Sequence, residues 1–314
     1  MRRGESGVNA LVAVDKPLGM TSHDVVSRVR RALGERRVGH AGTLDPAASG
    51  VLVVGVGQGT RLMGLLTAER KGYVGLVALG SETDTDDAEG TVTREAPAPD
   101  WARDPARATH AVSALVGESM QVPPAYSAIS VGGVRSYARA RAGERVELPA
   151  RPVTVYDARL IAVQEVGGRP AWLCSFDVSK GCYVRALARD LGRAQGSAAH
   201  LAELRRTSSG SVSLRDCVTL EELAAGGAAL LAARGLDPVR ALGLPVREVT
   251  GQEAADVACG RRIALGSPSG GEPGEAGRVS VVAGDRLLGV WERRGRGLVC
   301  SVNFPGGIQG VRHG

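Results

Sequence analysis

Aromatic side chains are scarce in this chain: three Trp, five Tyr and two Phe make up 3% of its 314 residues. Hydrophobic residues as a whole reach 43%, which lies in the range of ordinary globular proteins. The chain is therefore long enough and apolar enough to bury a sizeable core. On the rule of about 150 residues per domain, it should hold about two domains.

Paired cysteines and long apolar runs are also missing. The five cysteines form no CxxC pair, so the sequence indicates neither a zinc site nor a disulfide framework, and we expect reduced thiols in a cytoplasmic protein. No apolar stretch approaches the roughly 20 residues that span a bilayer. The arginines near the N-terminus are not followed by the apolar run of a signal peptide. We therefore expect no membrane partner.

Lysine is rare as well, with three lysines among 39 basic residues, yet the formal net charge is +6 and the isoelectric point is near 9.4. Clustered basic side chains gain affinity for polyanions by displacing the counterions condensed on phosphates. Basicity by itself is weak evidence, but it favours a nucleic acid as partner.

The order of apolar patterns predicts a mixed α/β chain without a regular repeat. An apolar run at 10–17 predicts a strand, and the helical pattern behind it has Ser22 as its expected N-cap and Gly34 as its stop. Further strands are expected at 51–57 and 72–80, and further helices at 60–69, 106–117 and 183–196.

The pattern changes after an Ala/Gly-rich stretch at 221–245. One short helix, a Gly/Pro/Ser-rich loop near 266–277 and three short strands follow, which is typical of a small, mainly β module. We therefore expect a larger domain over residues 1–235 and a β module over residues 244–314.

One carboxylate, that of Asp45, lies in a segment of small residues, "GHAGTLDPAASG". Read locally, Asp45 and Pro46 form an ordinary turn in which the side chain hydrogen-bonds its own backbone. The other interpretation is an ionised carboxylate open to a substrate, since small neighbours leave room for one. The local sequence by itself favours the turn.

Five motifs, in matching order and spacing, change that balance. They are "DKPLGMTSHDVV", "GHAGTLDPAASGVLVVGVGQGTRL", "KGYVGLVALGSETDTDDAEG", "VPPAYSAISVGGVRSYARARAGE", and "SKGCYVRALARDLG" followed by "AHLAELRR". Together they resemble bacterial TruB-type tRNA pseudouridine synthases over about residues 9–215. The tail resembles, more loosely, the PUA-like RNA-binding module of these enzymes.

The resemblance implies both a fold and a reaction. The fold is a mixed α/β (α+β) pseudouridine-synthase domain around an antiparallel sheet, with a PUA-like C-terminal module. The reaction is the isomerisation of the T-loop uridine at tRNA position 55 to pseudouridine. No cofactor is implied, and the sequence carries no GxGxxG, P-loop or metal-ligand spacing. The implied partner is the T-arm of tRNA, bound by a monomer that works without guide RNA.

The resemblance also implies catalytic roles. Asp45 is the nucleophile, which attacks either the sugar C1′ or the uracil ring. Arg185 keeps this carboxylate charged and oriented, because a nearby guanidinium favours the ionised form of an acid that a bound base desolvates. Asp87 orients Arg185, although the adjacent acids Asp84 and Asp86 leave a one-residue alternative open.

Four further positions match residues that surround the uridine. Tyr73 stacks on the base and assists proton removal, Tyr183 and Leu204 line the pocket, and His40 fills the space that the extruded base leaves. Without the resemblance, strand packing would explain Tyr73, a turn hydrogen bond would explain His40, and a helix core would explain Leu204. A solvated helix face would likewise explain Arg185.

Lys16 and Lys180 lie within matched motifs, and we expect them to approach backbone or phosphate near the substrate. The stretch around 121–150 is the expected RNA-contacting segment. The acid-rich run at 81–90 lacks the spacing of an EF-hand, so we expect no metal there.

The alternative function is that of a tRNA-binding folding factor that acts without catalysis. Asp45 and Arg185 distinguish the two hypotheses, because a pure binder would tolerate the loss of both residues, and both are present.

Overall fold

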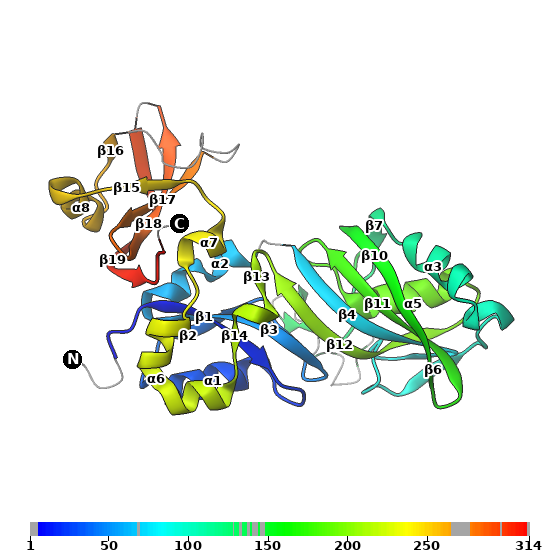
Figure 1. The fold of residues 1–314 in the computed structure, drawn as a ribbon. Helices are drawn as coiled ribbons and strands as arrows, with labels where there is room; N and C mark the ends of the chain where they lie inside the picture. Colours follow the sequence, from blue (N-terminus) through cyan, green and yellow to red (C-terminus); the bar gives the residue numbers. More distant parts are fainter. Residues whose placement is uncertain are drawn as a thin grey trace. The chain divides into compact units, whose positions relative to one another are not determined.

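The computed structural model describes residues 6–67, 70–127, 129–131, 134–136, 139, 144, 148–264, 277–295 and 297–312. The chain divides into two compact units (Figure 1): unit 1 comprises Met1–Glu69 and Ser208–Gly314, and unit 2 comprises Arg70–Thr207. Parts of the expected RNA-contacting segment near 121–150, and nearly all of the Gly/Pro/Ser-rich loop near 266–277, lie outside the described residues.

Unit 1 is organised around the antiparallel pair of β1 (Ala10–Lys16) and β3 (Ala48–Val56). β2 (Val38–Ala41) pairs antiparallel with β3, and β14 (Cys217–Val218) pairs parallel with β1. Every residue of β3 is buried, as the apolar run from residue 51 predicts for a central strand.

Helix α1 (Ser22–Leu33) places its expected apolar face in the core with the strands, and each buried Val or Leu there contributes roughly 1.5–3 kcal/mol relative to exposure. Gly34 ends the helix in the left-handed conformation, at φ 61°, so that prediction is confirmed. The predicted N-cap was wrong by one residue. Thr21 caps the helix in a reciprocal capping box with Asp24, because the hydroxyl of Ser22 is used elsewhere.

The remaining helices of unit 1 are short or interrupted. The helix expected at 60–69 is a 3₁₀ turn, η1 (Gly57–Leu62), followed by one turn of α2 (Met63–Leu66). The Ala/Gly-rich stretch forms α6 (Leu220–Arg234), which is kinked at Gly227, and α7 (Pro238–Leu242).

The C-terminal part of unit 1 is mainly β, as predicted. Its five-stranded sheet has the order β15-β17-β18-β19-β16, and α8 precedes β16 in the chain. Phe304 and Ile308 of β19 belong to the same buried cluster as Leu11 and Val53. The elements are β15 (Val246–Glu248), α8 (Gly251–Ala258), β16 (Ile263–Ala264), β17 (Arg278–Ala283), β18 (Arg286–Arg294) and β19 (Gly297–Gln309).

Unit 2 holds strands in the order β12-β4-β11-β10-β7. β10 pairs antiparallel with β7 and β11, and β11 pairs antiparallel with β4, which confirms the expected antiparallel sheet in a mixed α/β chain. These strands are β4 (Lys71–Leu79), β7 (Gly117–Gln121), β10 (Arg151–Val166), β11 (Arg169–Val178) and β12 (Ala199–Ser209).

The other elements of unit 2 for which bounds can be given are a small hairpin, three helical segments and a short strand pair. They are β5 (Ser81–Thr83), β6 (Val92–Glu95), η2 (Asp100–Arg103), α3 (Pro105–Ser113) and α5 (Val184–Ala194), with β8 (Ser130–Val131) and β9 (Val134–Arg135) as a separate short pair. The helices expected at 106–117 and 183–196 are thus present, and both are shorter than expected.

The helical interpretation of the sequence around Leu204 was wrong, because this stretch forms strand β12. Its neighbour β4 explains the difference: a Cβ on Gly75 would lie 3.0 Å from Cδ1 of Leu201 and 3.5 Å from Cδ1 of Leu204. A short apolar pattern fits a helix or a strand, and pairing with β4 in the sheet decides between them.

The helices of the described ranges include none with both the length and the apolar character needed to cross a lipid bilayer.

Candidate active site

In unit 1, Asp45 lies in the loop between β2 and β3, on a backbone that is held at both neighbouring residues. Ser22 Oγ accepts from the Leu44 amide at 2.8 Å and donates to the Leu44 carbonyl at 3.0 Å. The Gly19 amide donates to the Pro46 carbonyl at 2.9 Å. The Asp45 carbonyl accepts from the Ala48 amide at 3.0 Å, so a backbone turn is present, while the residue itself is only half-buried.

Lys16 is fully buried beneath the same loop. Its Nζ donates to the carbonyls of Pro17 at 2.9 Å and Met20 at 2.6 Å, and lies 3.5 Å from the carbonyl of Pro46. A buried ammonium needs such acceptors, because leaving one unpaired costs several kcal/mol. These contacts assign Lys16 to the support of the loop beside Asp45.

His40 lies on β2 directly opposite Val54 of β3, and it is half-buried. Its position on a regular strand, five residues before Asp45, differs from the simple turn that the local sequence favoured.

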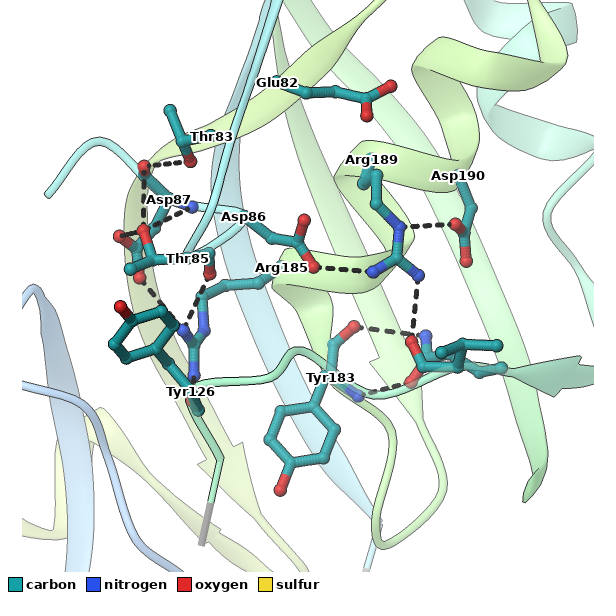
Figure 2. A network of polar contacts seen from close by, with 12 residues as sticks. Glu82, Thr83, Thr85, Asp86, Asp87, Tyr126, Tyr183, Arg185, Arg189 and Asp190 are labelled. Atoms are coloured by element: carbon teal, nitrogen blue, oxygen red, sulfur yellow. Dashed lines mark hydrogen bonds and ion pairs between the residues drawn. The ribbon is translucent and has the colours of Figure 1, made fainter. Parts of the chain in front are cut away.

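In unit 2, Arg185 lies in the first turn of α5 with 6% of its surface exposed. One terminal nitrogen donates to the Thr85 carbonyl at 2.9 Å and to Asp87 Oδ2 at 3.2 Å, and the other donates to the Tyr126 carbonyl at 2.9 Å. Figure 2 shows these acceptors around the guanidinium. The side chain is therefore held in one orientation by acceptors from two separate segments.

Asp87 is itself restrained. Its Oδ1 accepts from the Thr85 hydroxyl at 2.6 Å and from the Glu89 amide at 3.1 Å. The neighbouring acids have other partners: Asp86 pairs with Arg189 at 2.7 Å, and Asp84 accepts from the Thr91 amide. Among the three crowded acids, the one beside Arg185 is Asp87.

The acids of this loop differ in their electrostatics. Burial raises the pKa of Asp86 to about 6, although the guanidinium groups of Arg189 and Arg185 oppose the rise. For Glu82, the hydrogen bond and ion pair with Arg193 lower the pKa, and Arg94 adds to the effect while burial opposes it. For Glu82, the effect of Arg193 and Arg94 on the pKa therefore exceeds that of burial. For Asp86, the effect of burial exceeds that of the nearby arginines.

The remaining candidate residues of unit 2 lie on different elements. Tyr73 is 8% exposed on β4, opposite Phe176 of β11. Tyr183 is the half-buried residue before α5, and the guanidinium carbon of Arg151 lies 4.8 Å from its ring centroid. Lys180 is exposed in the turn that leads to α5.

Leu204 lies half-buried on β12, with its side chain next to Gly75 of β4.

Three supporting residues escaped the sequence analysis. Ser22 was interpreted as a cap, whereas its hydroxyl holds Leu44. Gln121 accepts from the Tyr183 amide at 2.9 Å and donates to the Tyr183 carbonyl at 3.2 Å. Arg189 pairs with Asp86. The four-residue spacing of arginines on α5 was the available signal for Arg189, while nothing local marks the other two.

No group of three or more His, Cys, Asp or Glu side chains within the described ranges has the arrangement of a metal site. In the acid-rich run, Asp84, Asp86 and Asp87 all accept hydrogen bonds from protein donors. This loop is therefore organised around arginines and backbone amides.

Comparison with known proteins places these features in a family. The model of the TruB family pseudouridylate synthase N-terminal domain matches residues 30–184, and that of the tRNA pseudouridylate synthase B C-terminal domain matches residues 185–242. The tRNA pseudouridine synthase B of Paenarthrobacter aurescens (strain TC1) is 48% identical over 274 residues, covering 86% of this chain and 85% of that protein. Its counterpart from Thermobifida fusca (strain YX) is 45% identical over 303 residues, covering 95% and 99%.

Solved structures agree at the level of the fold. A Cbf5-Nop10-Gar1 complex contains a chain that matches with a TM-score of 0.68 at 24% identity, over 98% of this chain and 87% of that one. The archaeal box H/ACA sRNP Nop10-Cbf5 complex matches with a TM-score of 0.65 at 25% identity, over 96% and 86%. By its sequence motifs, its family matches and its relatives, the chain belongs to the TruB family of pseudouridylate synthases.

Proposed function

We propose that this protein isomerises the T-loop uridine at position 55 of tRNA to pseudouridine, with Asp45 as the nucleophile. The observation that carries the proposal is the construction of the Asp45 loop. Ser22 holds Leu44 and Gly19 holds Pro46, so the backbone on both sides of Asp45 is anchored while the residue between them stays half-buried. A nucleophile needs this combination of a fixed origin and an accessible side chain.

The reaction rearranges one nucleotide without a net change in composition. The bond between uracil N1 and ribose C1′ breaks, a bond between uracil C5 and C1′ forms, and the proton on C5 is replaced by one on N1. In one route the carboxylate of Asp45 attacks C1′ and is released when C5 attacks the same carbon. In a second route it adds to the uracil ring, and in a third a glycal forms by elimination. Each route begins with an ionised Asp45.

The other residues take supporting roles in the proposal. Arg185 supplies the positive charge that favours the ionised nucleophile once the base displaces water, and Asp87 restrains Arg185. Tyr73, Tyr183 and Leu204 contact the uridine.

Two further positions are proposed to contact the RNA itself. Extruding the base from its stack costs a few kcal/mol. His40 occupies the space that the extruded base leaves. Lys180, which is exposed, contacts the RNA backbone, and Lys16 acts through the loop that it supports.

The proposal extends to organisation and setting. Residues 1–235 form the catalytic domain, with an RNA-contacting segment near 121–150, and the β module at 244–314 grips RNA away from the reaction. The protein acts as a monomer, without guide RNA, on tRNA in the cytoplasm. The net charge of +6 and the free state of all five cysteines support an RNA partner and a reducing compartment.

The test mixes purified protein with an unmodified tRNA transcript, without added cofactor or metal, and maps pseudouridine by carbodiimide-dependent primer-extension stops. Wild type should produce a stop at the T-loop uridine. Asp45→Asn should bind the transcript equally well and produce none, a loss of at least about 10⁴-fold in rate, because an amide cannot act as the nucleophile. Tight binding without a stop from either protein would instead support the folding-factor hypothesis.

A further inference from the structure

Three arginines follow one another at four-residue intervals along α5, and each pairs with an acid of residues 82–87. Arg185 pairs with Asp87 at 3.2 Å, Arg189 with Asp86 at 2.7 Å, and Arg193 with Glu82 at 2.6 Å. Side chains four residues apart lie on the same face of a helix, so the three pairs form a ladder along α5. We call them the arginine ladder.

Arg185 and Arg189 differ from Arg193 in the further acceptors that they bind. Arg185 donates to the Tyr126 carbonyl and Arg189 donates to the Val122 carbonyl, each at 2.9 Å. Arg193 has a half-exposed side chain and directs both Nε and Nη2 to Glu82. Arg185 and Arg189 therefore connect residues 82–87, which we call the acid loop, to residues 121–127. Within the described part of the chain, Arg193 binds the acid loop alone.

Arg189 is committed to protein partners at every nitrogen of its guanidinium. Nη1 donates to Asp86, Nη2 to the Val122 carbonyl, and Nε to Asp190 at 2.9 Å (Figure 2). The residue is 8% exposed. These contacts use three of the five guanidinium N–H groups, each nitrogen has a protein partner, and the side chain is buried, so we expect any effect of Arg189 on the reaction to pass through the groups that it holds.

The backbone of the acid loop is shaped to serve both arginines. Asp86 has φ 61° and is the one non-glycine residue with positive φ among the described residues. Asp tolerates this conformation better than most residue types. The bend is held by the Leu201 amide, which donates to the Asp86 carbonyl at 3.0 Å. It allows two consecutive acids to face successive arginines of one helix (Figure 2).

We propose that Arg189 and Asp86 form a positioning pair that sets the place of Arg185 and of residues 121–127 for the isomerisation. Arg185 and Arg189 lie one helical turn apart on α5, and both bind the acid loop and residues 121–127. Without Arg189, the buried Asp86 carboxylate and the Val122 carbonyl both lose a donor, and the segments that carry the acceptors of Arg185 lose a common anchor. This inference rests on the proposed function for its catalytic part.

The experiment compares Arg189→Met with Arg193→Met in steady-state pseudouridine formation. Arg193→Met is the matched control, since it removes the adjacent rung while Glu82 keeps its contact with Arg94 at 2.6 Å. We expect Arg189→Met to lower kcat about 100-fold with little change in KM, because a misplacement of about 1 Å has an effect of this size. Arg193→Met should stay close to wild type.

Two milder variants keep the test decisive if Arg189→Met folds poorly. Arg189→Lys retains the charge and should recover part of kcat. Asp86→Asn keeps a residue type that accepts positive φ and should lower kcat as Arg189→Met does. The double variant should then be no slower than the slower single one, since both changes break one pair.

A second measurement does not depend on activity. Amide hydrogen exchange in residues 121–127, without RNA, should be faster in Arg189→Met than in Arg193→Met. An inactive wild type with this difference would refute the proposed function and leave the structural part of the inference standing. An active wild type with equal exchange in the two variants, equal losses of kcat, or a loss confined to KM would overturn the inference.

Discussion

The loop that carries Asp45 and the helix that carries Arg185 are anchored at different points. Around Asp45 the anchors described above hold its neighbours: the hydroxyl of Ser22 binds Leu44, and the amide of Gly19 and the ammonium of Lys16 approach the carbonyl of Pro46. Around Arg185 the functional side chain itself is tied, to Asp87 and to two carbonyls.

The difference follows from what each group is proposed to do. A nucleophile must form a bond, so the protein restrains the chain on either side of it. A cation that acts by its field changes no bond, and restraining its side chain removes a reorganisation cost from the reaction. Changes to either kind of anchor therefore test the comparison.

Among changes to the anchors, the largest effect is expected where the tied side chain of Arg185 is replaced. Arg185→Lys keeps the charge, but one ammonium cannot reach Thr85, Asp87 and Tyr126 in the geometry of a planar guanidinium. We expect kcat to fall about 100- to 1,000-fold with tRNA affinity nearly unchanged, as for the loss of one preorganised donor. Single-turnover kinetics with a filter-binding control would measure both. Full activity in Arg185→Lys would show that charge alone is required.

A smaller effect is expected where an anchor next to the nucleophile is removed. Ser22→Ala leaves the buried Leu44 amide without its hydroxyl acceptor, which should lower the free energy of unfolding by about 1–3 kcal/mol. Because the variant still carries the Asp45 carboxylate, kcat should fall only about 10-fold, which corresponds to a rise of about 1.4 kcal/mol in the activation free energy. Urea unfolding and initial rates test the two effects.

Ser27→Ala, a change at a half-buried serine on the same helix as Ser22, is the control for Ser22→Ala. An equal loss of activity in both variants would argue against a specific anchor on Leu44.

The smallest expected effect is a pH dependence of the free energy of unfolding that arises from Asp86. Burial raises the pKa of Asp86 to about 6, so the folded state holds a proton that the unfolded state releases near pH 4. The contribution of Asp86 to stability is therefore full below about pH 4 and declines as the pH rises to about 6. The charged groups that face it are Arg189, Arg185, Asp190 and Arg193.

Urea midpoints of wild type and Asp86→Asn between pH 4 and pH 7 measure this decline. The stability of wild type relative to Asp86→Asn should fall across the window and level off above about pH 6. Glu82 contributes a pH dependence of opposite sign. Because its pKa is lowered in the folded state, its contribution to stability is present above the ordinary pKa of a glutamate and is lost as the pH falls. A difference that rises between pH 4 and pH 6 would contradict the assignment to Asp86.

Several parts of the fold followed directly from local patterns. The apolar run of β3, the apolar face of α1 and the glycine stop at Gly34 could be predicted, because period, cap and backbone freedom are properties of neighbouring residues. The C-terminal β module was equally visible, since its strands are short and separated by turns.

The motifs themselves located the candidate site residues, yet they did not show what holds them. Ser22 and Leu44 are 22 residues apart, and Arg185 and Asp87 are 98 residues apart. No local rule connects such positions. The strand at Leu204 escaped for a related reason, because its short apolar pattern suits a helix as well as a strand, and only pairing with β4 decides between them.

The sequence by itself determined the elements with strong periodicity, the basic character of the chain and the family to which it belongs, since each depends on residue type and order along the chain. Tertiary structure alone decided which acid faces which arginine, what the hydroxyl of Ser22 binds and where the ammonium of Lys16 is buried. Hydrogen bonds and ion pairs require contact within about 3 Å. That proximity exists only once distant segments of the chain have packed together.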